Sequence, residues 1–356
     1  MIRALADNRL NLLLVAAPVC WALYFWAPGS PWVFMTAAVS LVPLAGIIGL
    51  GTEELAARSG PALGGLLNAT FGNAAELIIA IAAIGEGHIG LVKASITGSI
   101  VGNLLLVLGA SFFIGGLGRR SQTFHRTAAT NSAVMLFLAV VALVMPAVFD
   151  LSLYGSLAAR PPAIDRLSLW SAVVLIVAYA GSLVYAWTAH RDLFRTAHEK
   201  HGGELSTAEA IGALALGTAL TAVQAEILVG AMTPAVRAFG WSELFVGVIV
   251  VALVGNAAEH YSAVVAASRD QMTLAVEIAV GSSAQIALLV APLVLLYSFA
   301  IGRPMSLIFH PFEIAAITLS VVATNLVVQD GESNWVEGLQ LLAVYAILTL
   351  AFYFVP

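Results

Sequence analysis

The sequence predicts an all-α polytopic membrane protein with 11 transmembrane helices, one N-terminal helix followed by two inverted five-helix repeats. Three observations predict this fold. Of the 356 residues, 60% are hydrophobic and only 10% are charged, against about 25% charged in soluble domains. The chain divides into apolar segments long enough to cross a bilayer. The five letters Gly-Asn-Ala-Ala-Glu occur twice, at 72–76 and at 255–259.

The first apolar segment runs from Leu10 to about Trp26. We expect a retained helix rather than a cleaved signal peptide, because Pro18, Trp21 and Trp26 interrupt its hydrophobic stretch and no clean small-residue cleavage site follows. Ten further segments are predicted with approximate ends: near 31–57, 62–85, 89–117, 124–149, 166–189, 207–236, 242–267, 272–300, 308–328 and 335–355.

The two halves of the chain are predicted to be copies of one unit. A shift of 183 positions (255 minus 72) aligns the two five-letter motifs and, without a gap, Gly98-Ser99 with Gly281-Ser282. Because each copy has five helices, an odd number, the second copy begins on the opposite side of the membrane from the first. The two copies are therefore inverted-topology repeats. We therefore expect an N-terminal helix at 1–30, a first repeat at 31–190, a cytoplasmic linker at 191–206 and a second repeat at 207–356.

The distribution of charge predicts an orientation. With the N-terminus in the cytoplasm, ten of the fifteen Lys and Arg residues lie on the cytoplasmic side. A bacterial inner membrane is the expected location. The single cysteine excludes a disulfide within the chain, and the common zinc-enzyme patterns are absent. We expect no enzymatic activity, no cofactor and no nucleic-acid partner; the lipid bilayer is the expected surrounding, and the oligomeric state stays open, a homo-oligomer included.

Glu76 and Glu259 are the central candidate site residues. Glu76 follows Pro61 by fifteen residues, which at about 1.5 Å per residue places it near the middle of a hydrocarbon core about 30 Å thick. A carboxylate at that depth is costly and indicates function. The residues before each Glu, Gly72-Asn73 and Gly255-Asn256, favour unwinding of the helix, which frees carbonyl oxygens. Two carboxylates with carbonyl oxygens suit a hard divalent cation such as Ca²⁺.

The following segment of each repeat supplies neutral oxygen donors. These are Ser99, Asn103, Ser282, Ser283 and Gln285. Because none is acidic, the two glutamates alone set the charge of the predicted site. Burial and mutual repulsion favour uptake of protons when no cation is bound, so one Ca²⁺ or two H⁺ neutralises the site. An empty doubly charged site is too costly to move through the membrane, and this predicts an antiporter.

Three further acidic residues are candidates for accessory roles. Glu54 and Glu226, with Glu53 beside Glu54, are expected near the two entrances, where they would attract cations. For Glu53 a solvated interfacial carboxylate is an equal alternative. Glu277 has no acidic counterpart, since Ala94 occupies the related position of the first repeat. The segments near 31–57 and 207–236 open the two repeats and are predicted to slide during transport.

The paired motifs, together with Gly-Ser-Ser-Ala-Gln-Ile at 281–286 and Asn-Trp-Val-Glu-Gly-Leu-Gln-Leu at 334–341, resemble the calcium/proton exchangers of the cation/calcium antiporter superfamily. The resemblance implies that Glu76 and Glu259 are shared ligands for Ca²⁺ and H⁺. It implies amide partners at Asn103 and Gln285, and backbone and side-chain roles for the two motif asparagines, Asn73 and Asn256. Ala75 and Ala258 stand where the sodium/calcium branch typically carries Pro, which favours protons over sodium as the counter-ion.

Other functions stay open at this point. A sodium-coupled, Na⁺/H⁺ or Mn²⁺/H⁺ exchanger of the same superfamily is the main alternative, and a cation channel with paired acidic groups is a weaker one. An intramembrane hydrolase is disfavoured, because no nucleophile or metal triad occurs at suitable spacing. The sequence does not determine the proton stoichiometry.

Overall fold

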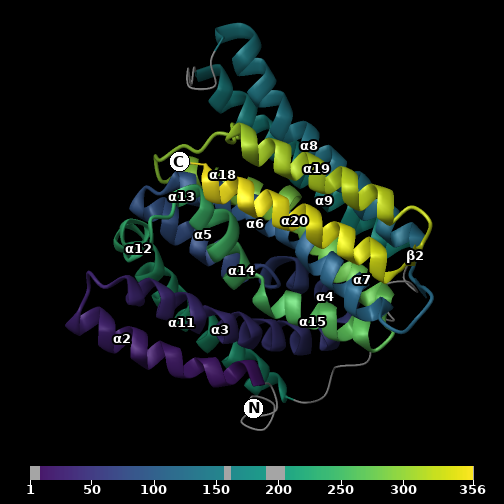
Figure 1. The fold of residues 1–356 in the computed structure, drawn as a ribbon, viewed down its shortest axis with the longest axis horizontal. Coiled ribbons are helices and arrows are strands. Elements are labelled where there is room, and N and C mark those ends of the chain that lie inside the picture. Colours follow the sequence, from purple (N-terminus) through teal and green to yellow (C-terminus); the bar gives the residue numbers. More distant parts are fainter. Residues whose placement is uncertain (1–8, 156–161, 190–204, 356) are drawn as a thin grey trace.

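The computed structural model describes residues 9–155, 162–189 and 205–355, and this part of the chain is almost entirely helical (Figure 1). The predicted linker at 191–206 lies outside the described residues except for its last two positions. The first eight residues of the predicted N-terminal helix region also lie outside them.

The helices of the first half carry the labels of Figure 1. They are η1 (Arg9–Val15), α2 (Ala16–Trp26), α3 (Pro31–Arg58), α4 (Gly60–Phe71), α5 (Ala74–Glu86), α6 (Ile89–Val101), the π-helical η2 (Gly102–Val107), α7 (Leu108–Gly116), α8 (Arg126–Tyr154) and α9 (Pro162–Ala189).

The second half continues with shorter pieces around its motif. They are α11 (Thr207–Gly230), α12 (Met232–Phe239), α13 (Glu243–Phe245), η3 (Val246–Val251), α14 (Ala252–Gly255), α15 (Ala257–Ser268), α16 (Met272–Val276), η4 (Glu277–Gly281), α17 (Ser282–Gln285), η5 (Ile286–Val290), α18 (Ala291–Ala300), α19 (Pro311–Val327) and α20 (Trp335–Phe354). Two short antiparallel strands, β1 (Gln122–Thr123) and β2 (Glu332–Ser333), join the loops before α8 and before α20.

Among the described residues, seven helices are long and apolar enough to cross a membrane. The pair Met232–Phe239 and Glu243–Gly255, bent by 114°, would make an eighth span, and two shorter apolar helices cover Leu10–Trp26 and Pro311–Val327. The chain is therefore a mostly helical integral membrane protein. The count of eleven spans stays a prediction.

Each motif interrupts its helix, as the Gly-Asn pairs predicted. Asn73 separates α4 from α5, and Asn256 separates α14 from α15, with nearly the same backbone angles (φ −104°, ψ 27° and φ −96°, ψ 8°). These angles lie in the sparsely populated bridge region. At Gly72 a methyl group would collide with the carbonyl oxygen of Asn68, so the break needs glycine there.

The two motif helices leave the site in opposite directions. α5 ends at Glu86, next to the beginning of the continuous span Ile89–Gly116. α15 ends against the other end of that span, where Arg119 donates a 3.3 Å hydrogen bond to the carbonyl oxygen of Ser268. This is the relation that an inverted repeat requires.

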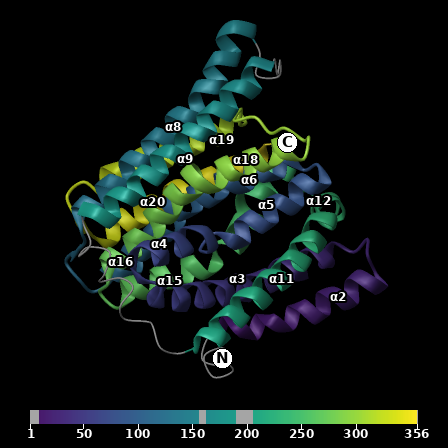
Figure 2. The same cartoon turned by 180° about the vertical axis from the view of Figure 1, so that it is seen from behind.

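The helices α2, α3 and α11 form one side of the molecule, and α8, α9, α19 and α20 form the other (Figures 1 and 2). α3 and α11 approach closely because glycines face the partner helix: a methyl group on Gly51 would lie 2.9 Å from the carbonyl oxygen of Ala210, and one on Gly217 would lie 3.0 Å from Ile48. The site described below lies between these two sides.

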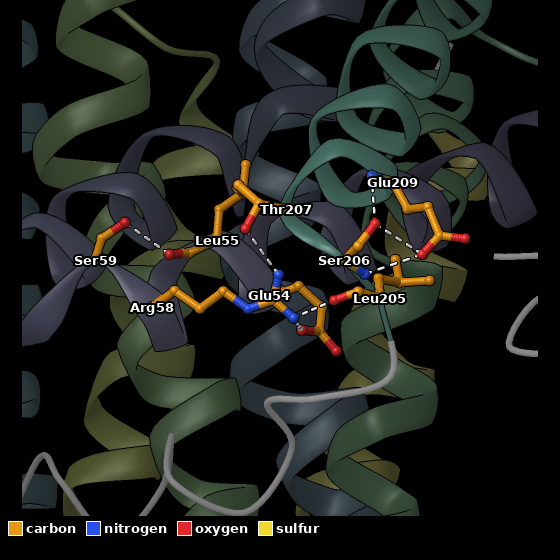
Figure 3. Close-up of polar contacts among 8 residues, drawn as sticks. All are labelled: Glu54, Leu55, Arg58, Ser59, Leu205, Ser206, Thr207 and Glu209. Atoms are coloured by element: carbon orange, nitrogen blue, oxygen red, sulfur yellow. Dashed lines mark hydrogen bonds and ion pairs between the residues drawn. The ribbon is translucent and has the colours of Figure 1, made fainter.

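One end of the α3–α11 pair is joined by the side chain of Arg58 (Figure 3). Arg58 donates to the carboxylate of Glu54 and to the hydroxyl of Thr207, both at 3.1 Å, and also to the carbonyl oxygen of Leu205. Ser206 and Glu209 form a capping box that begins α11 beside this contact. The last turn of α3 and the first turn of α11 are therefore held together.

Candidate ion-binding site

The two motif asparagines bind side chains in the other half of the chain. Asn73 donates from Nδ2 to Oε1 of Gln285 over 2.7 Å. Asn256 donates from Nδ2 to Oγ of Ser99 over 2.8 Å, and also to the carbonyl oxygen of Ala252 over 2.8 Å. Both asparagines are fully buried. The side-chain amide of the asparagine in each motif therefore connects that motif to the other half of the chain.

Asn103 and Ser282 connect these two contacts into one network. Asn103 Nδ2 lies 3.3 Å from Oδ1 of Asn256 and 3.2 Å from Oγ of Ser282, and donates to both. Ser282 donates to Oε2 of Glu259 over 2.8 Å, and its Oγ lies 3.4 Å from Oδ1 of Asn73. The structure therefore brings together the amides and hydroxyls that the sequence placed in separate helices.

The two glutamates lie close together but differ in their surroundings. Glu76 packs against the other motif, since a methyl group on Gly255 would lie 3.4 Å from its Cγ. Its Oε2 is buried and has no hydrogen-bond partner among the described residues. Glu259 accepts the Ser282 hydrogen bond, and its carboxylate repels that of Glu76.

A cavity of about 450 Å³ reaches this site from one side of the protein. Around the site it is lined by Gly72, Ala75, Gly255, Ala258, Glu259, Ser282 and Gln285. Towards its outer end it is lined by residues including Glu53, Arg269 and Gln271. Glu259 faces this cavity, whereas Glu76 is not among its lining residues.

The opposite side of the site is tightly packed. A methyl group on Gly98 would lie 2.6 Å from Cβ of Ala252, and one on Gly247 would lie 3.1 Å from the carbonyl oxygen of Leu91. The first-repeat helix α6 and the second-repeat segment Val246–Gly255 are therefore in direct backbone contact. Access to Glu259 is one-sided in this conformation.

The accessory acidic residues have different surroundings. Glu277 lines the cavity, and its accessory role stays a prediction. Of the neighbouring pair on α3, Glu53 lines the cavity, whereas Glu54 is buried and pairs with Arg58. Glu226 is exposed on α11 and is not among the cavity residues. Ser283 donates to the carbonyl oxygen of Ala279, away from the network.

No group of three or more His, Cys, Asp or Glu side chains that could hold a metal ion occurs among residues 9–155, 162–189 and 205–355. The arrangement suits a transported hard cation rather than a permanently bound transition metal.

Comparison with known proteins places this geometry in a family. The family model described as sodium/calcium exchanger protein matches residues 29–188 and 209–354. The chain belongs to this family. It is 42% identical to the Ca(2+)/H(+) antiporter of Synechocystis sp. over 363 residues, covering 97% of each chain.

Two solved structures of such exchangers share the fold. The structure of native YfkE has a TM-score of 0.84 at 38% identity, and the match covers 97% of this chain and all of that one. The H⁺/Ca²⁺ exchanger CAX has a TM-score of 0.71 at 15% identity, with 97% of this chain and 91% of that chain covered. The second likeness concerns the fold alone.

Sequence reasoning missed a second buried polar cluster in this exchanger-family chain. The Lys93 side chain is buried and donates from Nζ to the carbonyl oxygen of Ile308 over 2.6 Å. Nearby, Thr97 donates to Oε1 of the buried Glu313 over 3.1 Å. The position of Lys93 inside the apolar 89–117 segment was the available signal.

Proposed function

We propose that the chain is a secondary antiporter that exchanges Ca²⁺ for H⁺ by alternating access. The printed activity of one relative supports the proposal, that of the Synechocystis Ca(2+)/H(+) antiporter. The observation that carries it is the pair Glu76 and Glu259 at facing motifs, of which Glu259 accepts a hydrogen bond from Ser282 and lines the cavity.

In this proposal the two glutamates bind Ca²⁺ or protons in competition. The carboxylates supply a charge of −2, which one Ca²⁺ or two protons neutralise. The amide oxygens of Asn73, Asn256 and Gln285 and the freed carbonyl oxygens at the motifs complete an oxygen cage. Asn103, Ser99 and Ser282 orient these groups through the hydrogen bonds described above. An empty site would leave two buried charges together, so the protein changes conformation only when loaded.

Alternating access would exchange the open cavity for one on the opposite side. For this to happen, the tightly packed contact at Gly98 would have to separate. The helices proposed to slide are α3 and α11. The cross-link through Arg58 supports their movement as a pair. Glu226, exposed towards the later part of α11, is proposed to lie at the far entrance.

The proposed arrangement of the chain follows from the repeats. The N-terminal helix at 1–30 precedes a first five-helix repeat at 31–190, a linker at 191–206 and a second repeat at 207–356. With the N-terminus in the cytoplasm of a bacterial cell, the observed cavity would open to the cytoplasm. The conformation would then be the one that loads Ca²⁺ for export.

Radiolabelled Ca²⁺ uptake into vesicles with an imposed pH gradient tests the proposal. We expect uptake that depends on the proton gradient and needs no sodium. Uptake that requires a sodium gradient would assign the chain to the sodium-coupled exchangers instead. Calcium flux that does not depend on an opposing proton gradient would indicate a channel. Glu76→Gln is the matched negative control, because it preserves volume and removes one negative charge.

A further inference from the structure

One face of the helical segment from Met272 to Gln285 lines the cavity from its outer end to the ion site. The cavity residues on this segment are Leu274, Glu277, Ile278, Ser282 and Gln285, and Gln271 immediately precedes it. Their spacing of three or four residues places them on one side of the helix. The segment thus forms a continuous wall along the route to Glu259.

Glu277 stands part-way along this wall. It precedes Ser282 by five residues and follows Gln271 by six, which corresponds to roughly 7–8 Å and 9 Å along a helix. Its side chain is half-buried and makes no hydrogen bond or ion pair within the described parts of the chain. A carboxylate in this apolar helix that has no hydrogen-bond or ion-pair partner costs free energy. A structural role does not explain this cost.

The first repeat supplies an internal comparison. The related position is Ala94 (277 minus 183), which is fully buried. Its Cβ packs against the backbone at Gly247, within the closed wall on the opposite side of the site. The repeat architecture therefore does not need a carboxylate at this position. A carboxylate at this position therefore occurs on the open side of the site and not on the closed side.

We propose that Glu277 is a relay site for Ca²⁺, which draws the ion from the cavity mouth and passes it to Glu259. The inference rests on the proposed Ca²⁺/H⁺ exchange. A single carboxylate in a narrow cavity raises the local concentration of cations and their rate of entry. It speeds arrival and departure equally, so equilibrium affinity at the glutamate pair is unchanged. Because Ala94 offers no such group, the two faces of the membrane load Ca²⁺ at unequal rates.

Sided flux measurements on the full-length protein test this relay. Initial rates of radiolabelled Ca²⁺ transport would be measured in right-side-out and everted membrane vesicles at low ionic strength. For Glu277→Gln we expect a KM for Ca²⁺ from the cavity face that is roughly fivefold higher where entry limits the rate, as expected for one charge about 8 Å from a divalent ion at the barrier to entry in a water-filled space. The maximal rate and the KM from the opposite face should not change.

Three controls separate the relay from other roles. Equilibrium Ca²⁺ binding to purified Glu277→Gln should equal that of the wild type, and Glu277→Asp should restore the sided KM. Raising the ionic strength should remove the difference from wild type, because salt screens the charge in the cavity. Glu332→Gln removes a carboxylate that is exposed on β2 and absent from the cavity lining, so it should behave as wild type.

A KM that rises equally from both faces, weaker equilibrium binding in Glu277→Gln, or the same sided effect in Glu332→Gln would overturn the relay. A wild-type protein that binds Ca²⁺ but shows no proton-driven flux would instead overturn the proposed exchange. The two failures are therefore distinguishable in one set of vesicles.

Discussion

A single methyl group at Gly98 should open the contact between the two repeats. In Gly98→Ala the new Cβ would collide with the backbone carbonyl oxygen of Val248 and would lie 2.6 Å from Cβ of Ala252, whereas non-bonded carbon atoms prefer about 3.5–4.0 Å. α6 and the segment of Ala252 must therefore separate by about 1 Å. Ser99 adjoins Gly98, and its 2.8 Å hydrogen bond from Asn256 would lengthen towards about 3.8 Å, beyond the useful range.

The expected cost has two parts. Overpacking of a close contact costs about 1–3 kcal/mol, and the lost hydrogen bond about 1 kcal/mol. We expect Gly98→Ala to be less stable to denaturation in detergent by about 2–4 kcal/mol and to transport Ca²⁺ much more slowly in vesicles. The repeat-related Gly281→Ala is the matched control, because its methyl group would meet nothing within 4 Å. Wild-type stability and transport in Gly98→Ala would refute the packing argument.

Other variants test the remaining parts of the account. Glu76→Gln and Glu259→Gln should each fold but abolish proton-driven Ca²⁺ uptake, since a site of charge −1 cannot neutralise the ion; near wild-type uptake in either would require a separate proton path. Asn103→Ala and Gln285→Ala remove only neutral groups and should raise the KM for Ca²⁺ more than they lower the maximal rate, so kinetics with the opposite pattern would contradict their role. Arg58→Met keeps the aliphatic stem but removes the contacts to α11, and should lower thermal stability by about 1–3 kcal/mol; an unchanged melting temperature would show that the cross-link is not needed.

Much of the site was predictable because rare residues marked it. Carboxylates and asparagines are uncommon in apolar helices, so the repeated motif identified Glu76 and Glu259, and the 183-residue shift (255 minus 72) identified Ser99 and Ser282 as related positions. The helix breaks at Asn73 and Asn256 also followed from local residue preferences.

Features that depend on tertiary contacts were not predictable. The sequence treats the two glutamates alike, yet of the two only Glu259 lines the cavity, which depends on how the surrounding helices pack. Adjacent residues of a helix point about 100° apart. Which of Glu53 and Glu54 faces the cavity therefore depends on where α11 lies. The burial of Lys93 likewise depends on the loop that carries Ile308, which is distant in sequence.

The number of protons released when Ca²⁺ binds tests the central claim most directly. Calorimetric titration of the purified protein with Ca²⁺, in buffers of different ionisation enthalpy, gives this number. It should be measured at a pH low enough for both carboxyl groups to be protonated before binding. Because Ca²⁺ and protons are proposed to share Glu76 and Glu259, affinity should fall as the pH is lowered, and the released number should approach about two per ion. Tight binding that releases no protons and does not depend on pH would contradict the shared site.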